Sequence, residues 1–160
     1  MKKKDKKLLF ISSAGGHLAQ ILQLEPLFDK YEYKLLTENI SATQELKEKY
    51  NVDLIEVSKE SSKSLSYWVN FIYNIILAVK YMIVFKPNVI ISTGSHIAVP
   101  YCFVAKIFRK NVIYILTYAR INSKAKSADI VYPISDLFIV QWESMLKYYS
   151  KAKFLGGGLY

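Results

Sequence analysis

The chain is poor in cysteine and in acidic residues. Its one cysteine, Cys102, excludes an intramolecular disulfide and a zinc site built from several cysteines. Asp and Glu number 13 against 22 Lys and Arg, which gives a formal net charge of +9. Because no acidic cluster is present to hold a divalent metal, we expect neither a metal nor another cofactor. These features favour a reducing, cytosolic setting and an anionic partner such as nucleic acid, anionic lipid or a phosphorylated substrate.

The chain also lacks a linker. It has 6 glycines and 4 prolines, and no stretch rich in Pro, Gly or Ser divides it. A length of 160 residues suits one domain. Hydrophobic residues make up 52% and charged residues 22%, which is typical of a folded protein with a real core. We therefore expect a single domain over residues 1–160, so that a function needing two domains must find the second elsewhere.

An export signal is not indicated at the amino terminus. Residues 1–7 carry five lysines, but the apolar run at 8–11 has only four residues. An export signal needs an apolar segment of roughly 7 to 15 residues. We expect a basic tail at 1–7 followed by a first strand. The tail is either solvated or a polybasic patch that faces anionic lipid.

The longest apolar segment, 65–85, is long enough to cross a bilayer. Ser66, Asn70 and Asn74 recur every four residues, and Lys80 lies near the same helical face. The segment is thus predicted to form an amphipathic helix with a narrow polar stripe and an unusually wide apolar side. We expect it to lie in a membrane interface, with burial in the core and a true span as alternatives. The side chains expected to face the membrane are Trp68, Phe71, Ile72, Ile75 and Ile76.

Apolar runs of strand length alternate with helix-length segments along the chain. This alternation predicts a Rossmann-like, doubly wound parallel α/β sheet. The first, fourth and fifth strands are nearly all apolar, as expected of parallel strands that are covered on both faces. The predicted strands are 7–12, 33–37, 52–57, 89–92, 112–116, 130–131 and 153–155, and the predicted helices are 17–29, 41–50, 65–85, 97–108 and 135–149.

Two loops at strand ends are suited to bind an anion. Residues 12–17, Ser-Ser-Ala-Gly-Gly-His, follow the first strand and open a helix. The glycines allow close backbone approach, and the amides at the helix start attract an oxyanion such as a phosphate. The loop is neither a G-x-G-x-x-G dinucleotide motif nor a Walker loop. Residues 92–96, Ser-Thr-Gly-Ser-His, repeat this chemistry after the fourth strand, so the pair predicts one pocket for a phosphorylated group.

Both histidines of the chain lie in these loops. His17 is suited to donate to a phosphate or to act as a base, and a capping or packing role is the alternative. Arg120 follows the fifth strand, where its planar guanidinium suits either a phosphate or a surface ion pair. Glu143, in the predicted helix 135–149, is more typical of a solvated helix charge than of a catalytic acid.

Four segments resemble the signature segments of a family of small split-glycosyltransferase subunits: 12–18 (SSAGGHL), 92–96 (STGSH), 118–120 (YAR) and 140–143 (VQWE). The eukaryotic member of that family is the membrane-anchoring subunit of the dolichol-linked N-acetylglucosaminyltransferase, and its bacterial members act in capsule or exopolysaccharide synthesis. The chain is also similar to the amino-terminal half of the peptidoglycan glycosyltransferase that forms lipid II. The resemblance implies a GT-B N-terminal-type domain on the acceptor and membrane side, with the nucleotide-sugar site largely on another polypeptide.

The same resemblance implies roles for the loop residues. His17 is expected to act as the catalytic residue near the acceptor hydroxyl. One departure is that Leu116 and Thr117 stand where the family commonly has an acidic residue and a serine. An acid that assists the reaction in relatives is therefore either lost here or supplied by the partner. By the resemblance, the residues expected to bind the acceptor diphosphate are Gly15, Gly16, His17, Gly94, Ser95 and His96. From the chemistry of the segments themselves we add Ser13 and Arg120 as phosphate-binding residues.

The leading hypothesis is a membrane-associating, acceptor-binding subunit of a two-component glycosyltransferase at the cytoplasmic face of the plasma membrane. It would bind a polyprenyl-diphosphate-linked sugar and an anionic membrane surface, and would be weak or inactive without a catalytic partner that binds UDP-galactose or UDP-N-acetylglucosamine. Because the sequence shows no separate amino-terminal anchor, we expect a bacterial capsule or exopolysaccharide setting. The residues expected to dock the partner are Trp142, Glu143, Tyr148, Gly156, Gly157 and Gly158.

Two other hypotheses remain open at this point. A stand-alone UDP-sugar glycosyltransferase is disfavoured by length, because a donor site and an acceptor site normally take two domains. A nucleic-acid-binding module is suggested by the charge of +9 and the abundant aromatic residues. The lysines are dispersed, however, and no nucleic-acid-binding motif is present, so we expect no nucleic-acid partner.

Overall fold

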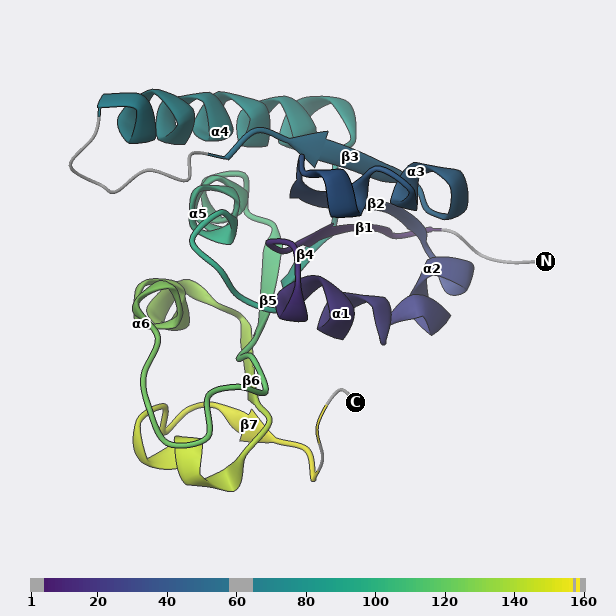
Figure 1. Ribbon diagram of the computed structural model, residues 1–160. Helices are drawn as coiled ribbons and strands as arrows, with labels where there is room; N and C mark the ends of the chain where they lie inside the picture. Colours follow the sequence, from purple (N-terminus) through teal and green to yellow (C-terminus); the bar gives the residue numbers. More distant parts are fainter. Residues whose placement is uncertain (1–4, 58–64, 157, 159–160) are drawn as a thin grey trace.

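A seven-stranded parallel sheet forms the centre of the computed structural model, which describes residues 5–57, 65–156 and 158 (Figure 1). The order of the strands is β3-β2-β1-β4-β5-β6-β7. This order confirms the predicted Rossmann-like, doubly wound sheet. The strands are β1 (Lys7–Ile11), β2 (Glu32–Glu38), β3 (Val52–Ile55), β4 (Val89–Ser92), β5 (Asn111–Ile115), β6 (Leu137–Val140) and β7 (Lys153–Phe154).

Helices cover both faces of the sheet, because the strands are apolar on both sides. Leu8 and Phe10 of β1 pack with α1 (Gly16–Leu22) and α2 (Glu25–Lys30). Leu9 and Ile11 point the other way and belong to the core that includes the three helices of the opposite face. Those helices are α4 (Leu65–Val84), α5 (Ala98–Ile107) and α6 (Lys126–Val131). The shorter elements are α3 (Leu46–Lys49) and the 3₁₀ turns η1 (Ser41–Thr43), η2 (Tyr132–Ile134) and η3 (Glu143–Lys147).

The sequence predictions fail in the carboxyl-terminal third. The predicted strand 130–131 is wrong, since these residues end α6, where Ala128 and Val131 pack on the core. The predicted helix 135–149 is also wrong, because it contains β6 and η3. Four consecutive apolar residues form β6, and such a run has no helical or alternating period to identify it. Two further predicted helices are each interrupted: 17–29 is divided into α1 and α2, and 41–50 into η1 and α3.

The two candidate loops begin side by side. Strands β1 and β4 are neighbours in the sheet, and Ile11 pairs with Ser92 at their carboxyl ends. After β1 the chain continues into α1 on one face of the sheet, and after β4 it continues into α5 on the other face (Figure 1). Ligands of open α/β sheets bind at such a switch point. The fold therefore places the loops after β1 and β4 where a ligand site is expected.

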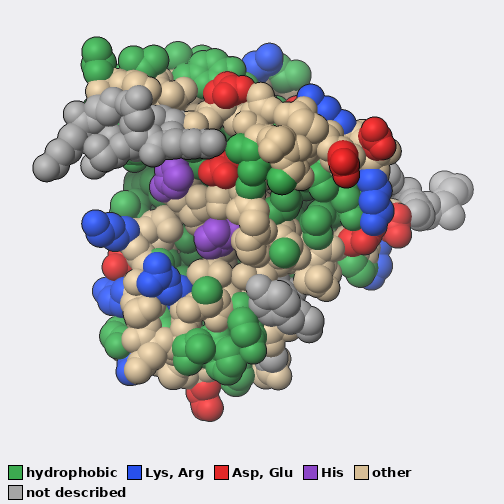
Figure 2. All heavy atoms as spheres, in the orientation of Figure 1, with side chains coloured by type: hydrophobic (Ala, Val, Ile, Leu, Met, Phe, Trp, Pro, Cys, Tyr) green, Lys and Arg blue, Asp and Glu red, His purple; other side chains and the backbone are tan. Residues whose placement is uncertain are grey.

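Helix α4 turns only part of its polar stripe toward the protein: Asn74 is buried and Asn70 half-buried, whereas Ser66 and Lys80 are exposed. Asn74, Ala78 and Met82 are its buried residues, and Asn74 Nδ2 donates to the Glu56 carbonyl while Asn74 Oδ1 accepts from the Tyr101 hydroxyl. The wide apolar side is therefore turned outward, and Figure 2 shows hydrophobic side chains along this helix. By length and composition α4 could cross a membrane, and only 17% of its most apolar window is buried.

The five side chains predicted to face a membrane divide into two groups. Trp68, Ile72 and Ile76 are exposed by 52%, 56% and 63%, so they form the outward face of α4. Phe71 and Ile75 are only half-buried at the edge of the helix that meets α5, where they line an apolar groove. The outward apolar face is thus narrower than predicted, but it is a continuous surface of one helix.

Candidate functional site

Hydrogen bonds join the two candidate loops at His17. The Nδ1 atom of His17 lies 2.8 Å from the Thr93 carbonyl oxygen, and the Thr93 hydroxyl donates to the His17 carbonyl at 2.7 Å. A carbonyl oxygen can only accept, so Nδ1 must carry the hydrogen. In the neutral ring Nε2 is then an acceptor. The first contact orients the imidazole, the second ties the backbone of His17 to the loop after β4, and one ring nitrogen is left able to take a proton.

Gly94 is the residue that allows His17 to occupy this position. Its φ is +117°, and a Cβ atom there would lie 2.8 Å from Cε1 of His17 and 3.3 Å from the Tyr114 hydroxyl. The Ser92 hydroxyl accepts the Gly94 amide hydrogen at 3.1 Å. Ser95 follows with φ of 82°, in the left-handed region that glycine favours. The loop after β4 is therefore shaped to receive the His17 ring.

A cleft of about 760 Å³ opens beside this contact and gathers most of the predicted anion-binding residues. Gly16, His17, Ser95 and His96 line it from the two loops, and Arg120 lines it from the segment after β5. Figure 2 shows both histidines in the hollowed face, with Lys and Arg side chains beside them. Ser13, Gly15 and Gly94 are in the same loops but do not line the cleft.

Two cations of the cleft were missed by the sequence analysis. Lys124 and Lys126 lie in and just after the loop that carries Arg120, and both line the cleft. Lys124 also pairs with Asp129 at 3.2 Å, and Arg120 donates to the Ser123 hydroxyl at 3.1 Å. No carboxylate is among the described lining residues. Three cations and the amides at the start of α1 can together bind a doubly charged group such as a diphosphate.

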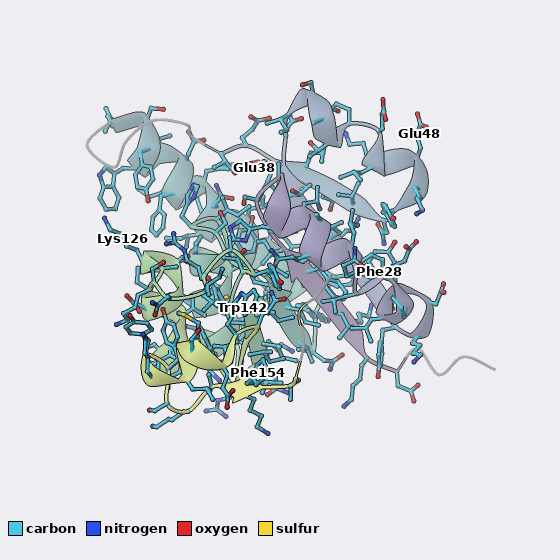
Figure 3. All side chains as sticks on the ribbon, turned by 60° about the horizontal axis from the view of Figure 1, so that its bottom comes forward. Phe28, Glu38, Glu48, Lys126, Trp142 and Phe154 are labelled. Carbon is cyan, nitrogen blue, oxygen red and sulfur yellow. The ribbon has the colours of Figure 1, made fainter. Side chains whose placement is uncertain are left out.

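Glu38 is a third residue that the sequence analysis missed. It ends β2, the neighbour of β1, and its Oε2 atom accepts the Ala14 amide hydrogen at 3.1 Å. The sequence feature that could have identified Glu38 is a charged residue at the end of the strand beside the first loop. Figure 3 labels Glu38 together with Lys126 and Trp142, which come from three separate parts of the chain and surround this end of the sheet. One backbone donor of the first loop is therefore already occupied by a carboxylate.

Two buried glutamines hold the segment that carries Arg120. Gln141 Nε2 donates to Gln20 Oε1 at 2.8 Å, and Gln20 Nε2 donates to the Thr117 hydroxyl at 3.0 Å. Gln20 is 1% exposed and Gln141 is 4% exposed. Buried amides of this kind are costly unless they are paired, so the network fixes α1, the segment after β5 and the end of β6 relative to one another. Thr117, which departs from the family pattern, has a structural role here.

The predicted partner-docking residues are not brought into the cleft. Glu143 and Tyr148 are exposed, whereas Trp142 is half-buried and its indole N–H donates to the Tyr118 carbonyl at 2.7 Å. Gly158 lies against the Tyr118 ring, where a Cβ atom would be 2.5 Å from Cε2. Gly156 is exposed, and Gly157 lies outside the described residues. Gly158 thus contacts Tyr118, two residues before Arg120.

Two buried groups, Cys102 and Tyr114, are held in neutral form. Burial raises the pKa of the Cys102 thiol to about 12, which makes it a poor nucleophile. Burial also raises the pKa of Tyr114, whose hydroxyl lies 3.2 Å from the Ser127 hydroxyl at the cleft wall. Within the described ranges, no group of three or more His, Cys, Asp or Glu side chains could hold a metal ion.

Comparison with solved structures supports the fold. Residues of this chain superpose on MurG from Acinetobacter baumannii with a TM-score of 0.69 and 13% identity, covering 87% of this chain and 42% of that one. For UDP-N-acetylglucosamine 2-epimerase from Rickettsia bellii the TM-score is 0.72 and the identity 16%, covering 96% and 45%. The chain therefore spans less than half the length of these two proteins, and at such identities the likeness concerns the fold alone.

Comparison with known sequences identifies the family. The chain is 25% identical over 177 residues to the mouse UDP-N-acetylglucosamine transferase subunit ALG14, covering 94% of this chain and 82% of that protein. It is 33% identical over 91 residues to the subunit of the same name from Candida albicans, covering 53% and 42%. The family described as "Oligosaccharide biosynthesis protein Alg14 like" matches residues 8–157, a range that includes both histidine loops and Arg120. On this match the chain belongs to the Alg14-like family of oligosaccharide biosynthesis proteins.

Proposed function

We propose that this protein is the acceptor-binding, membrane-associating subunit of a two-component glycosyltransferase. It presents a polyprenyl-diphosphate-linked glycan to a catalytic partner, which binds the UDP-sugar. The observation that carries the proposal is the cationic cleft beside His17 on a domain whose α4 turns its apolar side outward. The relatives named as subunits of UDP-N-acetylglucosamine transferase support a partner and favour N-acetylglucosamine over galactose as the transferred sugar.

The chemistry assigned to the cleft follows from its residues. Arg120, Lys124 and Lys126 bind the acceptor diphosphate. Nε2 of His17 accepts the proton of the acceptor hydroxyl as its oxygen attacks the anomeric carbon of the donor sugar. The new glycosidic C–O bond forms as the bond from that carbon to UDP breaks, and UDP leaves with the electron pair.

The position in the cell follows from the surface of α4. An outward apolar helix and a net charge of +9 favour a membrane surface that is anionic. Because UDP-sugars are made in the cytoplasm, we place the protein at the cytoplasmic face of the plasma membrane. A bacterial capsule or exopolysaccharide pathway stays the predicted setting, and Glu143, Tyr148 and the terminal glycines stay the predicted partner surface.

Sugar transfer by the separate and combined components tests this function. Radiolabelled sugar from UDP-N-acetylglucosamine, or from UDP-galactose in a parallel assay, is offered to lipid-linked acceptor in membranes. The membranes contain this protein, the glycosyltransferase encoded next to it, or both. We expect substantial transfer only when both are present. Robust transfer by this chain alone would contradict the two-component proposal and support the stand-alone enzyme.

Membrane association is tested at the outward face of α4. The double variant Ile72→Ser/Ile76→Ser is expected to bind anionic vesicles about tenfold or more weakly, because two exposed isoleucines no longer enter the apolar boundary. Co-sedimentation with vesicles measures the effect. Ile121→Ser/Leu155→Ser is the matched control, since these residues are also exposed, at 53% and 68%, but lie outside α4. Equal losses for both double variants would argue against α4 as the membrane contact.

A further inference from the structure

An apolar groove of about 440 Å³ lies among α4, α5 and α6. Phe71 and Ile75 of α4, Val99 and Phe103 of α5, and Ile130 of α6 are among its lining residues. Among the described residues, every side chain that lines it is apolar. Its volume falls within the roughly 300 to 1,000 Å³ that small-molecule sites occupy. A recess of this size, apolar in the part of its lining that the structure describes, is suited to a hydrocarbon chain.

The groove and the cationic cleft are adjacent along the same two helices. His96, just before α5, lines the cleft, and Val99 and Phe103 on α5 line the groove. On α6, Lys126 lines the cleft and Ile130 lines the groove. Such separations of three to four residues correspond to about one helical turn, or about 5.4 Å along the axis. A molecule that lies across α5 and α6 therefore passes from a cationic to an apolar environment within a short distance.

A narrow slot makes the same connection beneath α4. His96, which lines the cleft, also lines this slot, and Phe71 and Pro100 line both the slot and the groove. The slot holds only about 20 Å³, which is near the size of one water molecule. A hydrocarbon chain leaving the cleft therefore follows the surface between α5 and α6 rather than the slot.

From this arrangement we infer that the groove binds the first isoprene units of the acceptor lipid while the cleft binds its diphosphate. The inference rests on the proposed function, which supplies the diphosphate. The acceptor is an amphiphile with a doubly charged head joined directly to an apolar chain, and cleft and groove match these parts in charge and in order. The protein thereby selects its lipid by the chain next to the phosphate as well as by the phosphate.

Binding of soluble allylic diphosphates tests this inference without a membrane. Dimethylallyl, geranyl and farnesyl diphosphate, with one, two and three isoprene units, are titrated calorimetrically into the full chain at concentrations below aggregation. We expect the Kd of farnesyl diphosphate to be at least about tenfold lower than that of dimethylallyl diphosphate, because each added unit buries apolar area. Phe103→Gln/Ile107→Gln is expected to reduce this ratio to about two- to threefold.

The choice of variants keeps folding and binding separate. Phe103 and Ile107 are 43% and 77% exposed, so polar replacements should leave the fold intact, and thermal unfolding checks this. Ile83→Gln/Val84→Gln is the matched control, because these residues are 55% and 71% exposed on α4 and do not line the groove. This control is expected to keep the full dependence on chain length.

Each other outcome overturns a defined part of the scheme. Equal affinity for the three diphosphates would show that the groove does not bind isoprene units, while the cleft would still bind the diphosphate. This result is expected if the groove instead receives a protein partner. A chain-length dependence that survives Phe103→Gln/Ile107→Gln, or is lost in the Ile83→Gln/Val84→Gln control, would place the hydrocarbon elsewhere and overturn the groove. Failure of all three to bind would overturn the proposed acceptor site itself.

Discussion

Replacement of His17 by alanine is expected to lower sugar transfer by the assembled two-component enzyme about 10²- to 10⁴-fold, the range typical of a lost general base. The loss should appear in kcat rather than in KM for the lipid-linked acceptor, because the cations that hold the diphosphate remain. The measurement is steady-state transfer with both subunits present. An equal loss through KM alone would instead make His17 a ligand of the acceptor.

The variant His17→Asn separates the two tasks of this residue. An asparagine amide can donate to the Thr93 carbonyl in place of Nδ1–H, so the link between the loops after β1 and β4 is kept. It has no basic nitrogen in place of Nε2. We expect His17→Asn to unfold at nearly the wild-type temperature and to transfer sugar as poorly as His17→Ala. If His17→Asn restores transfer, His17 is a positioning residue and the base lies on the partner.

The sheet and both anion-binding loops could be predicted because their signals are local. Apolar runs such as Leu8 to Ile11 mark buried parallel strands, and glycine with histidine at a strand end marks a ligand loop. The order of the strands then brings the loops together, since β1 and β4 are neighbours. That adjacency follows from the general handedness and topology of such sheets rather than from any single residue.

Features that depend on distant pairs could not be predicted. Gln20 and Gln141 are 121 residues apart in sequence and meet only because α1 and the end of β6 reach the same edge of the sheet. The strand β6 is too short and uniformly apolar to be distinguished from a helix by its pattern. Lys124 and Lys126 have no local signal either, because a surface lysine is ordinarily solvated.

The orientation of α4 could not be predicted from the sequence for a different reason. The sequence indicates a polar stripe and a wide apolar side, and the outward apolar face proves narrower than predicted because Phe71 and Ile75 are half-buried. A stripe alone does not say which side meets the protein, and an ordinary surface helix buries its apolar side. Here Asn74 is buried because Tyr101 and the Glu56 carbonyl satisfy its amide. This arrangement leaves a polar contact at Asn74 inside and exposed apolar side chains such as Trp68 and Ile72 outside.

Replacement of Gly94 by alanine is expected to lower the free energy of unfolding by about 2 to 4 kcal/mol. A non-glycine residue at φ of +117° is strained by about 1 to 3 kcal/mol, and its Cβ would lie 2.8 Å from the His17 ring, which must move. Chemical denaturation measures the loss. Because the ring cannot keep its contact with Thr93, sugar transfer should fall as well. Wild-type stability in Gly94→Ala would mean that the loop after β4 has another conformation.

Gly16→Ala is the matched variant and separates backbone strain from access to the ligand. Gly16 begins α1 without a positive φ, and a Cβ there would meet nothing within 4 Å. Alanine at this position should therefore leave stability unchanged or raise it by up to about 1 kcal/mol. Gly16 nevertheless lines the cleft, so the added methyl group should weaken binding of dimethylallyl diphosphate, measured by calorimetry. A stable Gly16→Ala variant that binds normally would show that the diphosphate lies against the cations of the cleft and not against the start of α1.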